Sequence, residues 1–178
     1  GVRTLPRKLK VGITTTTILD STLTVGKKVS DSTSSSAIYG YIEQVGGRLN
    51  SATTSRVGAG YSDGTYSGVP LYSITGSGTG AAADITISGG KVSGNPTVTT
   101  AGTGYVVGDI LGITTSNVFK GSGAQISVTS LSGKDTLYLT NVQGEEFTSG
   151  QDLVVYNGST AVSFANTDIT SSTLISSL

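Results

Sequence analysis

The side chains that could support catalysis are few in this chain, and their spacing does not form a reactive set. Glu145 and Glu146 are the only adjacent carboxylates in the sequence. Neighbours on a strand point to opposite faces, so these two cannot jointly flank a glycosidic bond, and we expect them in a solvated turn. The absence of His and Cys excludes a Ser-His-Asp triad, a thiolate nucleophile and a cysteine-ligated zinc site. The composition therefore predicts a protein that is not an enzyme.

Two aspartates, Asp63 and Asp109, lie beside glycine-rich turns, where carboxylate oxygens can bind calcium. They stand at different offsets from the surrounding glycines, and the nonapeptide pattern of calcium-binding β-rolls is absent. We therefore expect each aspartate to cap its own turn, through hydrogen bonds to its own local backbone. The run Gly-Ser-Gly-Thr-Gly at residues 76–80 lacks the Gly-Lys-Ser/Thr end of a phosphate loop and is predicted to be a loop between strands. No metal and no cofactor are expected.

Four of the eight tyrosines gather around the glycine-rich middle of the chain, namely Tyr61, Tyr66, Tyr72 and Tyr105. Exposed rings there could stack on sugars and form a glycan-binding face. The alternative is that the rings pack over glycine turns and leave their hydroxyls in water. The second interpretation is favoured because the sequence has no Trp, which sugar-binding platforms usually include.

Positive charge is concentrated at the start of a chain whose formal net charge is zero. Arg3, Arg7, Lys8 and Lys10 lie within the first ten residues, and we expect residues 1–20 to form an extended basic arm. The arm could be solvated, could be an edge strand kept soluble by its charge, or could lie on the acidic surface of a neighbouring subunit. No aromatic residue interleaves these charges, so nucleic acid is not an expected partner. No apolar run approaches the roughly eighteen residues that span a bilayer, so a membrane is not expected either.

The pattern of apolar residues predicts an all-β fold. Apolar residues recur at every second position over residues 8–13, 83–88, 125–129 and 136–140, and helix formers rarely cluster. Gly89-Gly90 and Asn157-Gly158 each lie between two such runs, which predicts two hairpins. We expect small antiparallel modules, sandwich-like or barrel-like, joined by glycine-rich turns.

Two internal repeats accompany these strands. The motif Gly-x-Gly-Tyr-x-x-Gly occurs at residues 58–64 and again 44 residues later, at 102–108. A second template, an apolar residue, two spacers, Gly, two spacers and another apolar residue, occurs at 23–29, 105–111 and 147–153. We interpret the second template as a turn in which an apolar side chain anchors the loop in the core and Gly allows the chain to reverse.

These features divide the chain into four segments, which could also be lobes of one domain. They are a basic arm at 1–20, a small β unit at 21–57, a glycine-rich β module at 58–130, and a C-terminal hairpin module at 131–178. The chain begins with Gly rather than Met, and we interpret it as a fragment or a processed product.

Residues 58–113, with both tyrosine–glycine motifs, resemble modules repeated in large virion proteins of tailed bacteriophages, especially those of marine cyanobacteria. The run Leu-Thr-Asn-Val-Gln-Gly at 139–144, followed by Phe-Thr-x-Gly at 147–150, resembles a second module of the same proteins. Together the similarity covers up to about two thirds of the chain.

The resemblance implies a non-catalytic structural protein of the virion. It would be incorporated by contacts with other virion proteins and with copies of itself. The family includes tail, baseplate, fibre and head-surface proteins, and the tail or baseplate is favoured over a head decoration. It transfers no functional residues. The alternative is an adhesin-like module that recognises host-surface glycans through the tyrosine-rich middle segment.

Overall fold

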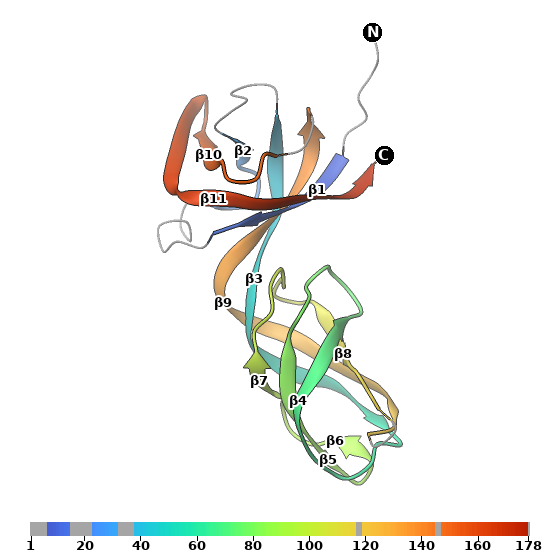
Figure 1. Ribbon diagram of the computed structural model, residues 1–178. Helices are drawn as coiled ribbons and strands as arrows, with labels where there is room; N and C mark the ends of the chain where they lie inside the picture. The colour runs from blue at the N-terminus through green and yellow to red at the C-terminus, as the bar shows by residue number, and fades with distance from the viewer. Residues whose placement is uncertain (1–6, 15–22, 32–37, 117–118, 145–146, 178) are drawn as a thin grey trace. The chain divides into compact units, whose positions relative to one another are not determined.

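The chain folds entirely from strands wherever the structure describes it. The computed structural model describes residues 7–14, 23–31, 38–116, 119–144 and 147–177. These residues form eleven β-strands and no helix, which confirms the all-β antiparallel prediction (Figure 1). The strands are β1 (Arg7–Ile13), β2 (Lys28–Asp31), β3 (Tyr39–Ala59), β4 (Gly64–Ser73), β5 (Ala82–Ser88), β6 (Lys91–Val92), β7 (Thr97–Thr100), β8 (Ile110–Ile113), β9 (Ser122–Gln143), β10 (Asp152–Asn157) and β11 (Thr160–Ser177). Among these residues, no helix long and apolar enough to cross a membrane is present.

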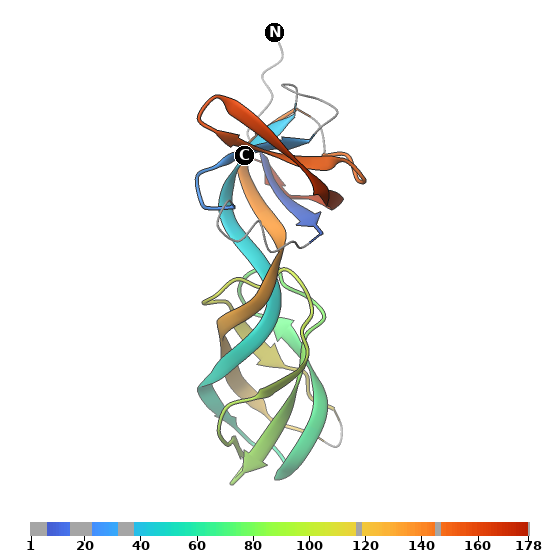
Figure 2. The same cartoon turned by 90° about the vertical axis from the view of Figure 1, so that its left-hand side faces the viewer.

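The strands build two compact units. Unit 1 combines Gly1–Val45 with Gly133–Leu178, and unit 2 is Gly46–Ser132. The long strands β3 and β9 contribute to both units and run side by side (Figures 1 and 2). The division after Ser132 lies close to the boundary expected near residue 130. The boundaries expected near residues 20 and 57 are not divisions between units, because the two ends of the chain pair with each other into one unit.

Unit 1 is a closed ring of six strands. The neighbour order is β1–β11–β10–β2–β3–β9, and β9 pairs again with β1. Closure leaves no free edge in this ring, which removes the usual site of edge-to-edge aggregation. The interior is filled by apolar side chains from all six strands and from the loops: Leu9, Val11, Ile13, Leu23, Val29, Ile38, Ile42, Leu137, Leu139, Val142, Phe147, Leu153, Val155 and Ile169.

Strand β1 corrects the expectation of an N-terminal arm. It pairs antiparallel with β11 on one edge and with β9 on the other. Its alternating sequence explains this position, because Leu9, Val11 and Ile13 are buried in the ring while Lys8 and Lys10 lie on the opposite face. The basic residues from position 7 onward thus belong to a strand paired on both sides. Arg3 lies outside the described residues.

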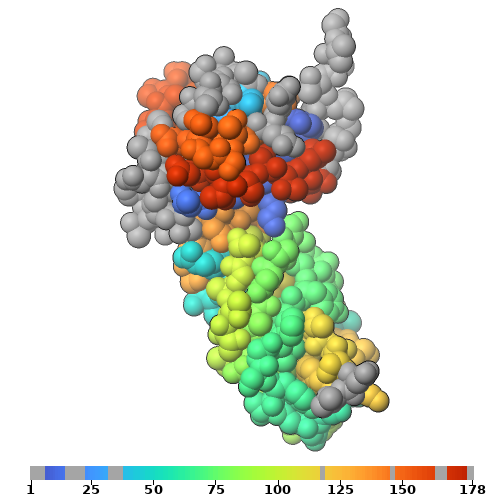
Figure 3. Space-filling model, in the orientation of Figure 1, coloured from blue at the N-terminus to red at the C-terminus, as the bar shows by residue number. Residues whose placement is uncertain are grey.

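Unit 2 wraps a second sheet around its own core. Its order is β3–β9–β8–β4–β5, and the far edge of β5 pairs with both β6 and β7. The chain after β7 then returns to β3, where the backbones of Gly47 and Tyr105 exchange two hydrogen bonds. The core comprises Leu49, Ala52, Tyr61, Val69, Leu71, Ala81, Ala83, Ile85, Ile87, Val92, Tyr105, Leu111, Ile113, Phe119, Ala124, Ile126 and Val128. Figure 3 shows one face of unit 2, which is built mostly from the segments after β3, coloured green to yellow.

The second repeated template forms the same anchored glycine turn three times, as predicted. Its first apolar residue is buried in each copy, and its glycine has a positive φ, at Gly26, Gly108 and Gly150. The glycine N–H donors and their acceptors are Gly26 to Ile42, Gly108 to Val128 and Gly150 to Ile169, at 2.7, 2.9 and 2.7 Å. The residue whose carbonyl accepts this bond also donates its own N–H to the carbonyl of the residue that follows the glycine. Each turn therefore fastens an incoming strand to a neighbour by a reciprocal pair of backbone hydrogen bonds.

Both predicted hairpins are present. Strands β5 and β6 pair around Gly89-Gly90. Strands β10 and β11 pair up to Asn157 and Thr160, so the turn residues are Gly158 and Ser159. This turn lies one residue later than the Asn-Gly pair suggested, because Gly158 takes the positive φ and Asn157 remains in the strand.

Candidate functional site

The two tyrosines of the Gly-x-Gly-Tyr motifs are buried in unit 2 and form equivalent contacts. Tyr105 is fully buried, and its phenolic oxygen accepts a hydrogen bond from the Ala81 N–H at 3.0 Å. The phenolic oxygen of Tyr61 accepts from the Ala124 N–H, also at 3.0 Å. The rings pack so closely over glycine that a Cβ added at Gly78 or Gly121 would overlap the ring of Tyr105 or Tyr61, respectively.

These contacts reveal a third repeat. Gly-x-Gly-Ala occurs at residues 78–81, between β4 and β5, and at residues 121–124, where β9 begins. Tyr61 precedes the first copy but packs against the second, whereas Tyr105 packs against the first. Unit 2 thus has two halves, each containing one motif tyrosine followed by one Gly-x-Gly-Ala segment, which we call its glycine cradle. The tyrosine of each half packs into the glycine cradle of the other half, and we call these two contacts the tyrosine locks.

The structure separates the four tyrosines of the expected glycan face. Tyr61 and Tyr105 are in the core, so their rings cannot stack on a sugar. Tyr66 is half-buried and stacks on Phe119, with ring centroids 4.1 Å apart. Tyr72 is exposed. The predicted packing of tyrosine rings over glycine turns is confirmed for Tyr61 and Tyr105, but their hydroxyls bind backbone N–H groups rather than water.

Both aspartates beside the glycine motifs cap turns, but only Asp109 caps its own turn, as predicted, whereas Asp63 caps a distant one. Asp63 accepts a hydrogen bond from the Gly90 N–H at 2.8 Å, in the β5–β6 hairpin. Asp109 accepts from the Val106 N–H at 2.9 Å, within its own anchored glycine turn. Burial raises the pKa of Asp109, and the hydrogen bond from Val106 opposes that shift. Among the described residues, no group of three or more carboxylates is arranged to hold a metal ion. Glu145 and Glu146 lie outside them.

The basic residues of β1 contact unit 1 itself. Lys8 forms an exposed ion pair with Glu43 at 3.1 Å, and Arg7 donates a hydrogen bond to the Gly144 carbonyl. Burial lowers the pKa of Lys10, and the nearby charge of Asp135 opposes that shift. These three side chains are therefore engaged within the ring.

A different set of residues lines an open pocket of unit 1. The pocket has a volume of about 530 Å³, and we call it the lysine–tyrosine groove. Its lining residues are Thr24, Val25, Gly26, Lys27, Lys28, Tyr41, Tyr156 and Gly158. They come from the first anchored glycine turn, from β2 and β3, and from the β10–β11 hairpin, so strands from both ends of the chain contribute to it.

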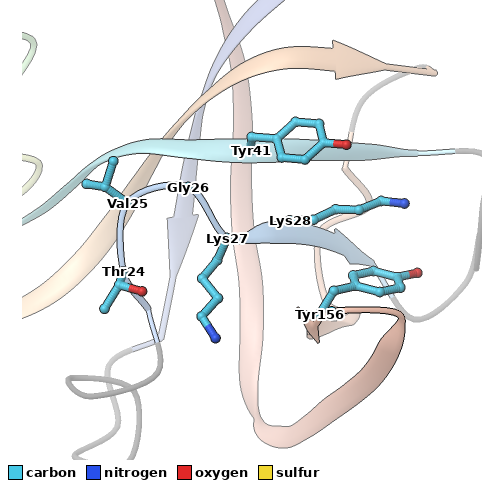
Figure 4. Close-up of a pocket in the computed structure, with 8 residues that line it drawn as sticks. Thr24, Val25, Gly26, Lys27, Lys28, Tyr41 and Tyr156 are labelled. Carbon is cyan, nitrogen blue, oxygen red and sulfur yellow. The ribbon is translucent and has the colours of Figure 1, made fainter.

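Two aromatic rings contact the ammonium group of Lys28, one of the residues that line this groove. Its Nζ lies 4.3 Å from the ring centroid of Tyr39 and 4.7 Å from that of Tyr156, within the range of cation–π attraction. Tyr41 and Tyr156 lie on either side of Lys28, while Lys27 points away from it (Figure 4). Tyr41 is 36% exposed and Val25 is 70% exposed. The groove therefore combines two cations with an accessible aromatic ring.

The repeat shows that the turn itself does not need these lysines. The positions of Lys27 and Lys28 are occupied by Gln151 and Asp152 in the copy at 147–153. The hydrogen bonds of the two turns are nevertheless the same. The two lysines are thus a departure from the repeat, and this departure is the signal by which sequence analysis could have found the groove. The contribution of Tyr156 could not have been found in this way, because it depends on the pairing of β10 with β2.

Comparison with known protein families, with curated proteins and with solved structures finds no match for this chain.

Proposed function

We propose that this chain is a structural component of a tailed-phage virion, incorporated through contacts with other virion proteins and with copies of itself. A place in the tail or baseplate is favoured over a head decoration. Both statements rest on the resemblance of residues 58–113 and 139–150 to modules of such proteins.

The structural observation that supports the proposal is the pair of tyrosine locks. The residues that bear the resemblance, the Gly-x-Gly-Tyr motifs, serve to join the two halves of unit 2 rather than to bind a ligand. Each lock satisfies a buried backbone N–H with a buried hydroxyl, which favours one packed arrangement over others. A rigid framework of this kind suits a part whose role is mechanical.

The chemistry of the described residues agrees with a structural role. Two of their carboxylates are buried: Asp31 accepts a hydrogen bond from the Thr148 N–H, and Asp109 caps a turn. Their most buried tyrosine, Tyr105, serves as an internal acceptor. Unit 1 is a closed ring and unit 2 returns on itself, so assembly would use side-chain surfaces and loops rather than long open strand edges.

Immunogold labelling of purified virions with an antiserum against this chain tests the proposal, together with mass spectrometry of the same particles. Regular labelling at the tail or baseplate, with peptides in stoichiometric amounts, is the expected result. Labelling confined to the head would move the chain to the capsid surface and contradict the favoured location. Peptides that are abundant in the lysate but absent from density-purified particles would overturn the virion role.

A further inference from the structure

We propose that the lysine–tyrosine groove of unit 1 binds an acidic saccharide, that is, a sugar carrying a carboxylate or sulfate group. This proposal does not depend on the virion role, because it rests on the residues of the groove alone.

The shape and lining of the groove suit one or two sugar rings. Its volume of about 530 Å³ lies within the usual range of about 300–1,000 Å³ for small-ligand sites. The exposed ring of Tyr41 offers a flat apolar surface for the C–H face of a sugar. The hydroxyl of Thr24 at the border of the groove offers a hydrogen-bond partner for sugar hydroxyls.

The charge of the groove selects an anion. Neither Lys27 nor Lys28 forms an ion pair with a described residue. The rings of Tyr39 and Tyr156 hold the Lys28 ammonium in one place, so little side-chain entropy remains to be lost when an anion binds. The turn does not require Lys28, whose ammonium is fixed close to the exposed ring of Tyr41. This combination favours a ligand with an apolar face and an acidic substituent.

Two other anionic partners fit less well. Unit 1 contains seven Lys and Arg residues against eight Asp and Glu residues, so it lacks the excess positive charge that attracts the phosphates of nucleic acids. An acidic peptide would supply carboxylates on flexible side chains but no rigid apolar ring for Tyr41. A discrete acidic sugar uses both features of the groove.

Isothermal titration of the full chain with a matched pair of disaccharides tests this inference. Cellobiuronic acid and cellobiose differ by one carboxylate, and a sulfated disaccharide provides the second anionic class. We expect at least one acidic sugar to bind and cellobiose to bind at least about tenfold more weakly. The Lys28→Gln substitution should weaken acidic-sugar binding by about 10- to 100-fold, whereas Lys28→Arg should largely retain it.

Three control measurements make the test specific. Lys91→Gln removes an exposed lysine of unit 2 and should leave binding unchanged. Tyr41→Ala should weaken acidic-sugar binding, and an unchanged circular dichroism spectrum would show that the variant is folded. Equal affinity for cellobiose and the acidic sugars, or acidic-sugar binding unaffected by Lys28→Gln, would overturn the proposal. So would tighter binding of hexa-aspartate or oligothymidine, or no binding of either acidic sugar at about 10 mM.

Discussion

Tyr61 and Ala124 are 63 residues apart in the chain, yet the phenolic oxygen of one accepts a hydrogen bond from the backbone N–H of the other at 3.0 Å. Tyr105 and Ala81 repeat this contact with the two halves of unit 2 exchanged. A motif that could have formed a tyrosine-rich binding surface therefore forms two reciprocal internal locks. The surface with binding chemistry lies instead in unit 1, where Lys28 is held between the rings of Tyr39 and Tyr156.

Removing one lock hydroxyl should destabilise the protein. We expect Tyr105→Phe to lower the free energy of unfolding by about 1–3 kcal/mol, because the buried Ala81 N–H loses its acceptor. Urea denaturation followed by circular dichroism measures the change. Tyr72→Phe is the matched control, since Tyr72 is 53% exposed and its change should stay within about 0.5 kcal/mol. Equal effects of the two substitutions would contradict the lock.

Filling a glycine cradle should also destabilise unit 2, for a steric reason. A Cβ at Gly78 would overlap the Tyr105 ring, and we expect Gly78→Ala to cost about 1–3 kcal/mol or more. Combining it with Tyr105→Leu should relieve part of that cost, which a double-mutant cycle detects as a coupling energy. Gly150→Ala is the control, because its cost comes from a positive φ with no atom within 4 Å. The free-energy changes of Gly150→Ala and Tyr105→Leu should add. If those of Gly78→Ala and Tyr105→Leu also add, the proposed overlap between the Cβ and the ring would be refuted.

The buried carboxyl of Asp109 should make stability depend on pH in a definite direction. Burial raises its pKa in the folded state, so its contribution favours folding when the carboxyl is protonated and is lost as the pH rises through that raised pKa. The wild-type protein should therefore gain stability relative to Asp109→Asn as the pH falls from 7 to 3. Denaturation of both proteins at several pH values measures this difference. A difference that is constant or runs the other way would show that burial does not control this group.

Unit 2 should fold without the rest of the chain. Its core residues all lie within 46–132, and its backbone closure between Gly47 and Tyr105 uses residues of the same segment. Residues 46–132 produced alone should give a dispersed NMR spectrum and a cooperative urea transition. The same segment with Tyr61→Ala and Tyr105→Ala should lose that cooperativity. A native segment that is unfolded at all urea concentrations would show that unit 2 depends on contacts outside it.

Local features of the fold could be predicted from the sequence because their causes lie within a few residues. Alternation of apolar residues identified strands such as Arg7–Ile13 and Ala82–Ser88, and paired turn residues identified both hairpins. The template of apolar residue, Gly and apolar residue identified all three anchored glycine turns, because the glycine conformation and the buried anchors are set by that short segment. Even here the β10–β11 turn shifted by one residue, since the strand pairing decided which residue took the positive φ.

By itself, then, the sequence determined the all-β class, the positions of turns and the exclusion of His- and Cys-dependent chemistry. Only the tertiary structure decided that β1 closes a ring with β9 and β11, that each Gly-x-Gly-Tyr tyrosine inserts into the opposite half of unit 2, and that Lys28 meets Tyr156. The physical reason is that these contacts join segments far apart in the chain. Their stability comes from closing a ring and filling a core together, and no local propensity of either partner records which distant segment it will meet.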